Sequence, residues 1–146
     1  MKLKTGAAGT LILGLLLFLA STGSAFAHGC TPGYWKVEQH HDSWVPTGYE
    51  PTDNLQDVFG PDAFDDTLLD ALNYGGGPGV DGAKMILLRA AVATLLNATH
   101  PDNDFGQTEQ QVLDNVAERL ASGDRDYMLA LAAFYDERNN AGCLLN

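Results

Sequence analysis

The chain is poor in cysteine, in lysine and in long apolar runs. Its two cysteines, Cys30 and Cys143, stand near the two ends, and only Lys36 and Lys84 follow the first 27 residues. After residue 27, Arg89 interrupts the longest apolar stretch. This stretch is shorter than the roughly 20 apolar residues needed to cross a bilayer. No convincing run alternates apolar and polar residues as a half-buried strand does. The sequence therefore argues against a membrane span and against a sheet protein.

Residues 1–27 have the three parts of a secretory signal. Two lysines among the first four residues precede an apolar run over residues 11–20. The segment Ser24-Ala25-Phe26-Ala27 follows, with small residues three and one before the expected cut. Cleavage at that point would make His28 the first residue of the product. We expect a signal peptide followed by a single secreted helical domain, residues 28–146, in the extracellular space or the periplasm.

The predicted domain is strongly acidic. The signal holds two of the eight basic residues and none of the nineteen acidic ones, which leaves a formal charge of −13 on residues 28–146. Such a surface repels phosphate backbones and anionic lipid, so nucleic-acid and membrane-surface binding are disfavoured. It favours cations such as Ca²⁺, or it keeps the protein soluble in salty surroundings. An extracellular protein or a glycan is the partner we expect.

Cys30 and Cys143 are expected to form a structural disulfide bond. Exported proteins meet an oxidising environment, and this pair would tie the two ends of the domain together. In the entropic model, closing a loop of over 100 residues restricts the unfolded chain by about 4–5 kcal/mol. That is a large share of the net stability of about 5–10 kcal/mol expected for a domain of this size.

Residues 28–61 combine closely spaced prolines and glycines with aromatic rings. Such punctuation permits at most one short helix, which we expect from Tyr34 to His41. The rings either pack onto a core and hold this loop-rich segment down, or form an exposed platform for a sugar or a peptide. The candidate ligand-binding residues of such a platform are Tyr34, Trp35, Trp44 and Tyr49.

Two helices are predicted in the middle of the chain. Asp65 or Asp66 would cap a short one that stops at Gly75, where a glycine-rich connection begins. Asp81 would cap a longer one to about Asn97, and its nearly all-round apolar character predicts a central, buried helix.

Two more helices are predicted toward the end of the chain. Thr108 and Gln111 form a capping box ahead of an amphipathic pattern that Gly123 ends. Asp124 would cap a last helix that closes near residue 140. The expected fold is mainly α, a small bundle of three to four helices with an irregular, aromatic-rich N-terminal wrap, closed by one disulfide.

His41 and Asp42 are the candidate catalytic residues. A histidine beside an aspartate in a secreted helical protein resembles the dyad of secreted phospholipases, whose imidazole activates a water while an aspartate helps to hold Ca²⁺. The resemblance stops at these two residues, since the cysteine and the glycine-rich calcium loop that precede that dyad are missing here. Two solvated histidines on a loop are the ordinary interpretation.

Three histidines are candidates for metal ligands: His28, His40 and His41. A free amino-terminal histidine binds copper through its amine and its ring, so Cu²⁺ joins Ca²⁺ among the ions considered, although no cofactor is firmly indicated. Asn97 opens a glycosylation sequon, which matters only in a host with that machinery.

The two ends of the predicted domain carry a recognisable pair of motifs, Cys30-Thr31-Pro32-Gly33-Tyr34-Trp35-Lys36 and Asn139-Asn140-Ala141-Gly142-Cys143. With the glycine run and the segment Leu88-Arg89-Ala90-Ala91-Val92-Ala93 between them, they resemble a family of secreted microbial domains that has no assigned activity. The resemblance implies the domain limits and the disulfide, and it implies no catalytic residue.

A non-enzymatic extracellular module, structural, surface-associated or ligand-binding, is therefore the leading hypothesis. The alternative is a small secreted hydrolase that uses His41 and Asp42, with or without Ca²⁺. Geometry distinguishes them, because a hydrolase needs that pair together in a concave site, whereas a binding module of the aromatic type needs clustered exposed rings.

Overall fold

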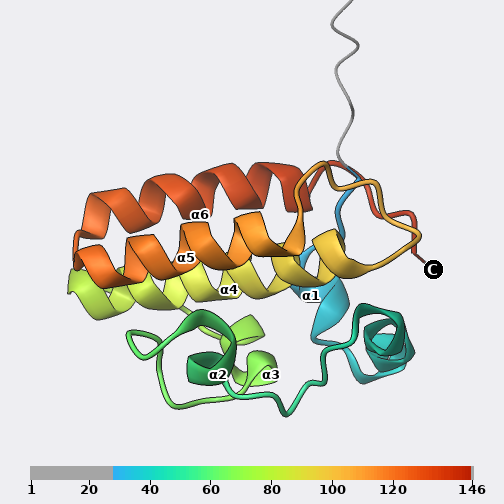
Figure 1. Cartoon of the computed structure of the whole chain (residues 1–146), viewed down its shortest axis with the longest axis horizontal. Helices are drawn as coiled ribbons and strands as arrows, with labels where there is room; N and C mark the ends of the chain where they lie inside the picture. The colour runs from blue at the N-terminus through green and yellow to red at the C-terminus, as the bar shows by residue number, and fades with distance from the viewer. Residues whose placement is uncertain (1–27, 146) are drawn as a thin grey trace, which may run out of the picture.

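The computed structural model describes residues 28–145, which form seven helices and no strand. The predicted signal peptide lies outside the described residues. In chain order the helices are α1 (Pro32–Trp35), the 3-10 helix η1 (Glu38–Thr47), α2 (Leu55–Phe59), α3 (Leu68–Leu72), α4 (Gly79–Thr99), α5 (Glu109–Ser122) and α6 (Arg125–Asn139). The three long helices lie side by side, and the short ones form a second layer, in which α1, η1 and α3 contact α4 and α2 contacts α5 (Figure 1). The mainly helical prediction is confirmed.

Helix α4 is the centre of the core, as its apolar faces predict. Its leucines Leu87, Leu88, Leu95 and Leu96 have no exposed surface. Helices α5 and α6 cover one side of α4, and α1, η1 and α3 cover the other. A helix that is apolar all round is stable only when it is enclosed in this way. Within residues 28–145 no helix is both long and apolar enough to cross a membrane.

The caps predicted for the two C-terminal helices are confirmed. At the start of α5 the Gln111 N–H donates to the Thr108 hydroxyl at 3.2 Å, and the Thr108 N–H donates to the Gln111 side chain at 2.9 Å. Gly123 ends α5 with a left-handed φ of 63°. The Asp124 carboxylate then accepts the Tyr127 N–H at 3.0 Å and starts α6. These helix ends depend on local contacts, which is why the sequence predicts them.

The predicted caps of the two middle helices were wrong. Thr67 caps α3 in a box with Asp70, because Asp65 and Asp66 have other partners: Asp65 accepts from Asn54 at 2.8 Å, and Asp66 accepts from a tyrosine hydroxyl. Helix α4 begins two residues before Asp81, with Pro78 at its cap.

The N-terminal wrap differs from the single short helix predicted over Tyr34–His41. Helix α1 ends at Trp35, Val37 is extended, and a 3-10 helix follows. The Trp35 carbonyl accepts the indole N–H of Trp44 at 3.0 Å, so it is engaged by a residue nine positions away. Helix α2 was not predicted at all.

Two glycines permit close approaches that position the wrap and the glycine-rich connection. A Cβ on Gly29 would collide with the Arg138 carbonyl at the end of α6. A Cβ on Gly82, in the first turn of α4, would collide with the Gly77 carbonyl. Glycine is therefore required at both positions for reasons of space.

Candidate functional site

The two cysteines form the predicted disulfide bond, with Cα atoms 4.4 Å apart across a sequence separation of 113 residues. Cys30 is fully buried, whereas Cys143 is exposed. The bond joins the segment before α1 to the segment after α6. The ends of the described chain are thus held at one end of the helical bundle (Figure 1).

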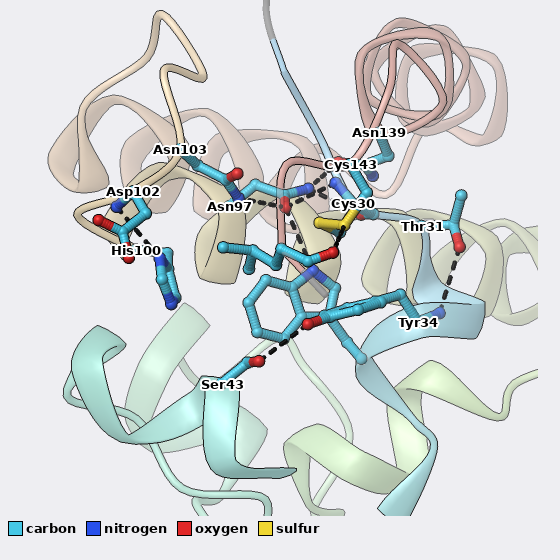
Figure 2. The surroundings of a disulfide bond; sticks show 12 residues. Cys30, Thr31, Tyr34, Ser43, Asn97, His100, Asp102, Asn103, Asn139 and Cys143 are labelled. Carbon is cyan, nitrogen blue, oxygen red and sulfur yellow. Dashed lines mark hydrogen bonds between the residues drawn. A yellow bond between two sulfur atoms is a disulfide. The ribbon is translucent and has the colours of Figure 1, made fainter. Parts of the chain in front are cut away.

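Beneath the disulfide, the buried Asn97 side chain connects three parts of the chain (Figure 2). Its Oδ1 accepts the Cys30 N–H at 2.8 Å, the Trp35 indole N–H at 3.2 Å and an Asn103 amide N–H at 3.1 Å. Its Nδ2 donates to the Cys30 carbonyl at 2.8 Å and to Asn139 Oδ1 at 2.9 Å. The amide is fully engaged, so a glycan on Asn97 is incompatible with this fold.

Asn139 extends the network to α6. Its Oδ1 also accepts the Thr94 hydroxyl at 3.1 Å, and its Nδ2 donates to the Ala90 carbonyl at 3.0 Å. Both asparagines are fully buried, and each of their side-chain oxygens and nitrogens has at least one partner, which makes this part of the network rigid. The sequence signal was present, since Thr94 and Asn97 are polar residues inside an otherwise apolar helix. The sequence alone marks Asn97 only as the first residue of a glycosylation sequon.

The two tryptophans of the predicted platform belong to the core. Trp35 is 0% exposed and Trp44 is 1% exposed, with their rings edge to face at a centroid distance of 6.3 Å. A ligand cannot stack on rings enclosed in this way. The two tryptophans instead pack into the core and hold the N-terminal segment against it. Of the two tyrosines, Tyr34 bonds to Ser43 at 2.8 Å, and Tyr49 donates to Glu109 at 2.5 Å. Burial, followed by the Glu109 contact, raises the pKa of Tyr49.

His41 and Asp42 line different hollows. His41 joins Trp44, Tyr49 and their neighbours around a small hollow of about 210 Å³, where its ring meets Trp44 edge-on. Asp42 lines a second hollow of about 420 Å³ together with Ser43 and His100. The structure therefore brings three of the sequence candidates together, but it does not bring the imidazole and the carboxylate of the dyad into one site.

The three histidines considered as metal ligands are not gathered either. Within residues 28–145 no three His, Cys, Asp or Glu side chains are placed to hold a metal ion. The His40 ring stacks on Tyr34 at a centroid distance of 4.0 Å, and the backbone N–H of His28 donates to the Asp104 carbonyl at 3.0 Å. A copper site at a cleaved amino terminus stays a prediction.

A larger hollow lies where α1, the end of α3, α4 and α6 meet. Its volume is about 570 Å³, within the range of small-molecule sites. We call it the Lys36 hollow, and it is lined by Thr31, Pro32, Gly33, Lys36, Leu72, Asn73, Tyr74, Gly75, Arg89, Asp136 and Asn140. Sequence reasoning did not find it, because no single segment supplies it.

Charged groups of both signs line the Lys36 hollow. Lys36 is exposed, and Arg89 is half-buried with one guanidinium N–H on the Tyr74 carbonyl at 3.1 Å. Burial raises the pKa of Asp136, and the opposing charge of Arg89 reduces that shift. A half-buried carboxyl with a shifted pKa in a hollow is a feature of functional sites.

Neutral polar groups complete the lining. The side-chain amide nitrogens of Asn73 and Asn140 donate to the backbone, to the Leu69 and Asp136 carbonyls, at 2.9 and 2.7 Å. Their amide oxygens are thus the groups left as acceptors. Thr31 accepts the Tyr34 N–H, so its hydroxyl hydrogen is left to donate. The hollow offers donors and acceptors side by side.

The family resemblance stays a prediction, and four of the segments on which it rests contribute residues to this hollow: the motif that ends at Lys36, Gly75 at the start of the glycine run, Arg89 and the motif that contains Asn140. The placement gives these motif residues a shared location that the sequence did not reveal. No family model, no curated protein and no solved structure matches the chain.

Proposed function

We propose that residues 28–146 act as a secreted, non-enzymatic binding module, with the Lys36 hollow as its ligand site. The observation that carries this proposal is the convergence of Lys36, Arg89 and Asp136, from three elements far apart in the sequence, around one hollow of about 570 Å³. Ligand sites of soluble proteins are typically concave surfaces with a few convergent polar groups.

The frame around the hollow supports this proposal. Helix α1, which precedes Lys36, is held by the Cys30 disulfide and by the Trp35–Asn97 hydrogen bond. Helices α4 and α6, which carry Arg89 and Asp136, are joined by the Asn97–Asn139 bond. The backbone segments that carry the lining groups are therefore held in place relative to one another before a ligand arrives. Such preorganisation lowers the entropic cost of binding.

Two observations favour binding over hydrolysis. A hydrolase needs its base and the carboxylate that orients it in one concave site, and His41 and Asp42 line separate hollows. The second hollow does contain Ser43 and His100, but the Nδ1 of His100 accepts the Asp102 N–H at 3.2 Å. In the neutral ring the other nitrogen then carries the hydrogen, so it cannot take a proton from a serine.

The test is a thermal-melt screen of the oxidised, exported protein against Ca²⁺, Cu²⁺, Zn²⁺, a glycan panel, phosphate, and amino acids with short peptides. A ligand at a hundredfold excess over its Kd stabilises the native state by about 2.7 kcal/mol. We expect a small polar ligand to raise the Tm, and we expect the shift to be lost in Lys36→Gln and kept in the matched variant Lys84→Gln.

Three outcomes would overturn the proposal. The first is a shift that survives both Lys36→Gln and Asp136→Asn, which would place the ligand elsewhere. The second is turnover of an ester substrate that His41→Ala abolishes in a folded protein, which would restore the hydrolase. The third is that no compound of the panel changes the Tm, which would leave only a structural role for the module.

A further inference from the structure

We infer that the ligand of the Lys36 hollow is a small zwitterion, a free α-amino acid or a short unblocked peptide, whose carboxylate faces Lys36 and Arg89 and whose ammonium faces Asp136. This inference rests on the proposed function and names its ligand class. It is argued from the partners of the charged side chains, from the charge of the whole protein and from the size of the hollow.

Lys36 differs from the other basic residues because its ammonium has no hydrogen-bond, ion-pair or ring partner within residues 28–145. The other side chains are engaged by neighbours. Lys84 donates to the Asp62 carbonyl at 3.0 Å, and Arg119 lies over the Tyr127 ring at 3.4 Å. Arg125 donates to backbone carbonyls of the glycine-rich connection, and Arg138 lies over the Phe134 ring at 4.5 Å.

Arg89 supplies the second cationic group of the hollow. One of its N–H groups is engaged with the Tyr74 carbonyl, and the guanidinium carries five donors in all. Lys36 and Arg89 therefore present two positive charges with spare donors to one hollow, in a domain with only six basic residues. A carboxylate is the chemical group that such a pair binds well.

Asp136 supplies the opposite charge. Its carboxylate is half-buried and accepts no hydrogen bond from the described residues, although its backbone carbonyl accepts the Asn140 amide. The charge of Arg89 offsets part of the cost of burying this carboxylate, but no donor within residues 28–145 contacts it, and a partly buried carboxylate without a donor remains costly. An ammonium group of the ligand would be that partner, and the Asn73 and Asn140 amide oxygens are further acceptors on the same lining.

The overall charge favours a zwitterion over an anion. A formal charge of −13 on residues 28–146 repels phosphate, sulfate and acidic polymers over a distance, whereas a molecule without net charge is not repelled. A simple anion would also set its charge against Asp136 and leave that carboxylate without a donor. A zwitterion satisfies both signs of charge, and a single amino acid or a dipeptide fits a hollow of about 570 Å³.

The test is isothermal titration calorimetry on the oxidised, exported protein with the twenty amino acids and with dialanine. For the best ligand, its N-acetyl and C-amide analogues are then measured. We expect the unblocked ligand to bind and each block to weaken binding at least tenfold. Free amino acids and dialanine separate the two sources of the zwitterion, because a site shaped for a peptide binds dialanine more tightly.

Variants assign each end of the ligand to its residue. In Asp136→Asn the free and N-acetyl ligands should bind with equal affinity, because the partner of the ammonium is gone. In Lys36→Gln the unblocked ligand and its C-amide analogue should bind with similar affinities, because the partner of the carboxylate is gone. Lys84→Gln should bind every analogue as the unaltered protein does. A merely structural role of Lys36 or Asp136 would weaken all analogues alike, so this pattern separates recognition from stability.

The outcomes separate this inference from the proposed function. If the N-acetyl ligand binds as tightly as the free one, no ammonium is recognised and the inference is wrong. If phosphate or a neutral sugar binds in a Lys36-dependent way and no amino acid or dipeptide does, the inference falls while the binding function stands. If nothing binds and amide chemical shifts at residues 31–36 do not move, both fall.

Discussion

Cys30 and Asn97 exchange two hydrogen bonds across 67 positions of the chain. The backbone N–H of Cys30 donates to Asn97 Oδ1, and Asn97 Nδ2 donates back to the Cys30 carbonyl, each at 2.8 Å (Figure 2). The side-chain amide thus satisfies the backbone of a buried residue as a neighbouring strand would. A backbone group buried outside regular structure needs such a partner.

The first prediction concerns the Asn97 side chain. Asn97→Ala would leave the Cys30 N–H, the Cys30 carbonyl and the Trp35 indole N–H buried without partners, each at a cost of about 1–3 kcal/mol. We expect the free energy of unfolding to fall by about 3–5 kcal/mol in urea denaturation. Asn73→Ala, at an exposed position with one backbone bond, is the control. A loss below about 1 kcal/mol would contradict a structural role of the network.

The second prediction concerns the disulfide. A double variant, Cys30→Ala with Cys143→Ala, removes the bond and leaves no free thiol. We expect a loss of about 4–5 kcal/mol in the free energy of unfolding, because the unfolded chain regains the freedom of a loop with ends 113 residues apart. Urea unfolding of both proteins measures it. Equal midpoints with equal slopes would show that the bond does not limit stability.

A third prediction compares Gly82, in the first turn of α4, with Gly75, in the connection that precedes this helix. Gly82→Ala should destabilise the fold by about 1–3 kcal/mol, because the new Cβ meets the Gly77 carbonyl and the loop must move. Gly75→Ala is the matched control, since its Cβ would enter open space without an unusual backbone angle. Thermal melts of both variants make the comparison. Equal losses would mean that the approach of residue 77 to α4 is not tight.

The fourth prediction is a pH dependence from His100. Burial lowers the pKa of this side chain below its ordinary value of 6.5, and Asp102 opposes the shift. The unfolded chain therefore binds a proton more readily than the folded one, and the stability should fall as the pH drops below about 6.5. Urea midpoints at several pH values test this. His100→Gln should flatten the curve between that value and the lowered pKa, and an unchanged curve would assign the effect to other groups.

The sequence predicted the long helices well because their signals are local. The Thr108–Gln111 box, Gly123 and Asp124 act within one turn of the chain, so the ends of α5 and the start of α6 were correct. The N-terminal wrap depends instead on distant partners. The Trp35 carbonyl is engaged by Trp44, and the Trp35 indole by Asn97, and neither contact has a local signature.

The candidate site was the least predictable part. The Lys36 hollow takes its lining from α1, from the residues after α3, and from α4 and α6, so only the packing of four segments creates it. The aromatic residues attracted attention because their spacing is visible in the sequence, yet burial of Trp35 and Trp44 is decided by the helices that enclose them. Lys36 is one of only two lysines after residue 27, and this scarcity is the one signal of the hollow that the sequence carries.

The unequal burial of the two cysteines decides which of their sulfurs a reducing thiolate can attack. Cys30 has no exposed surface, whereas Cys143 stands at the surface on the segment after α6. An attacking thiolate therefore reaches the sulfur of Cys143 and forms a mixed disulfide there. The S–S bond breaks, and Cys30 leaves as a thiolate that takes up a proton to become a thiol in the core. Reduction releases the C-terminal segment first, and the thiol left behind is shielded from further oxidation by the surrounding core.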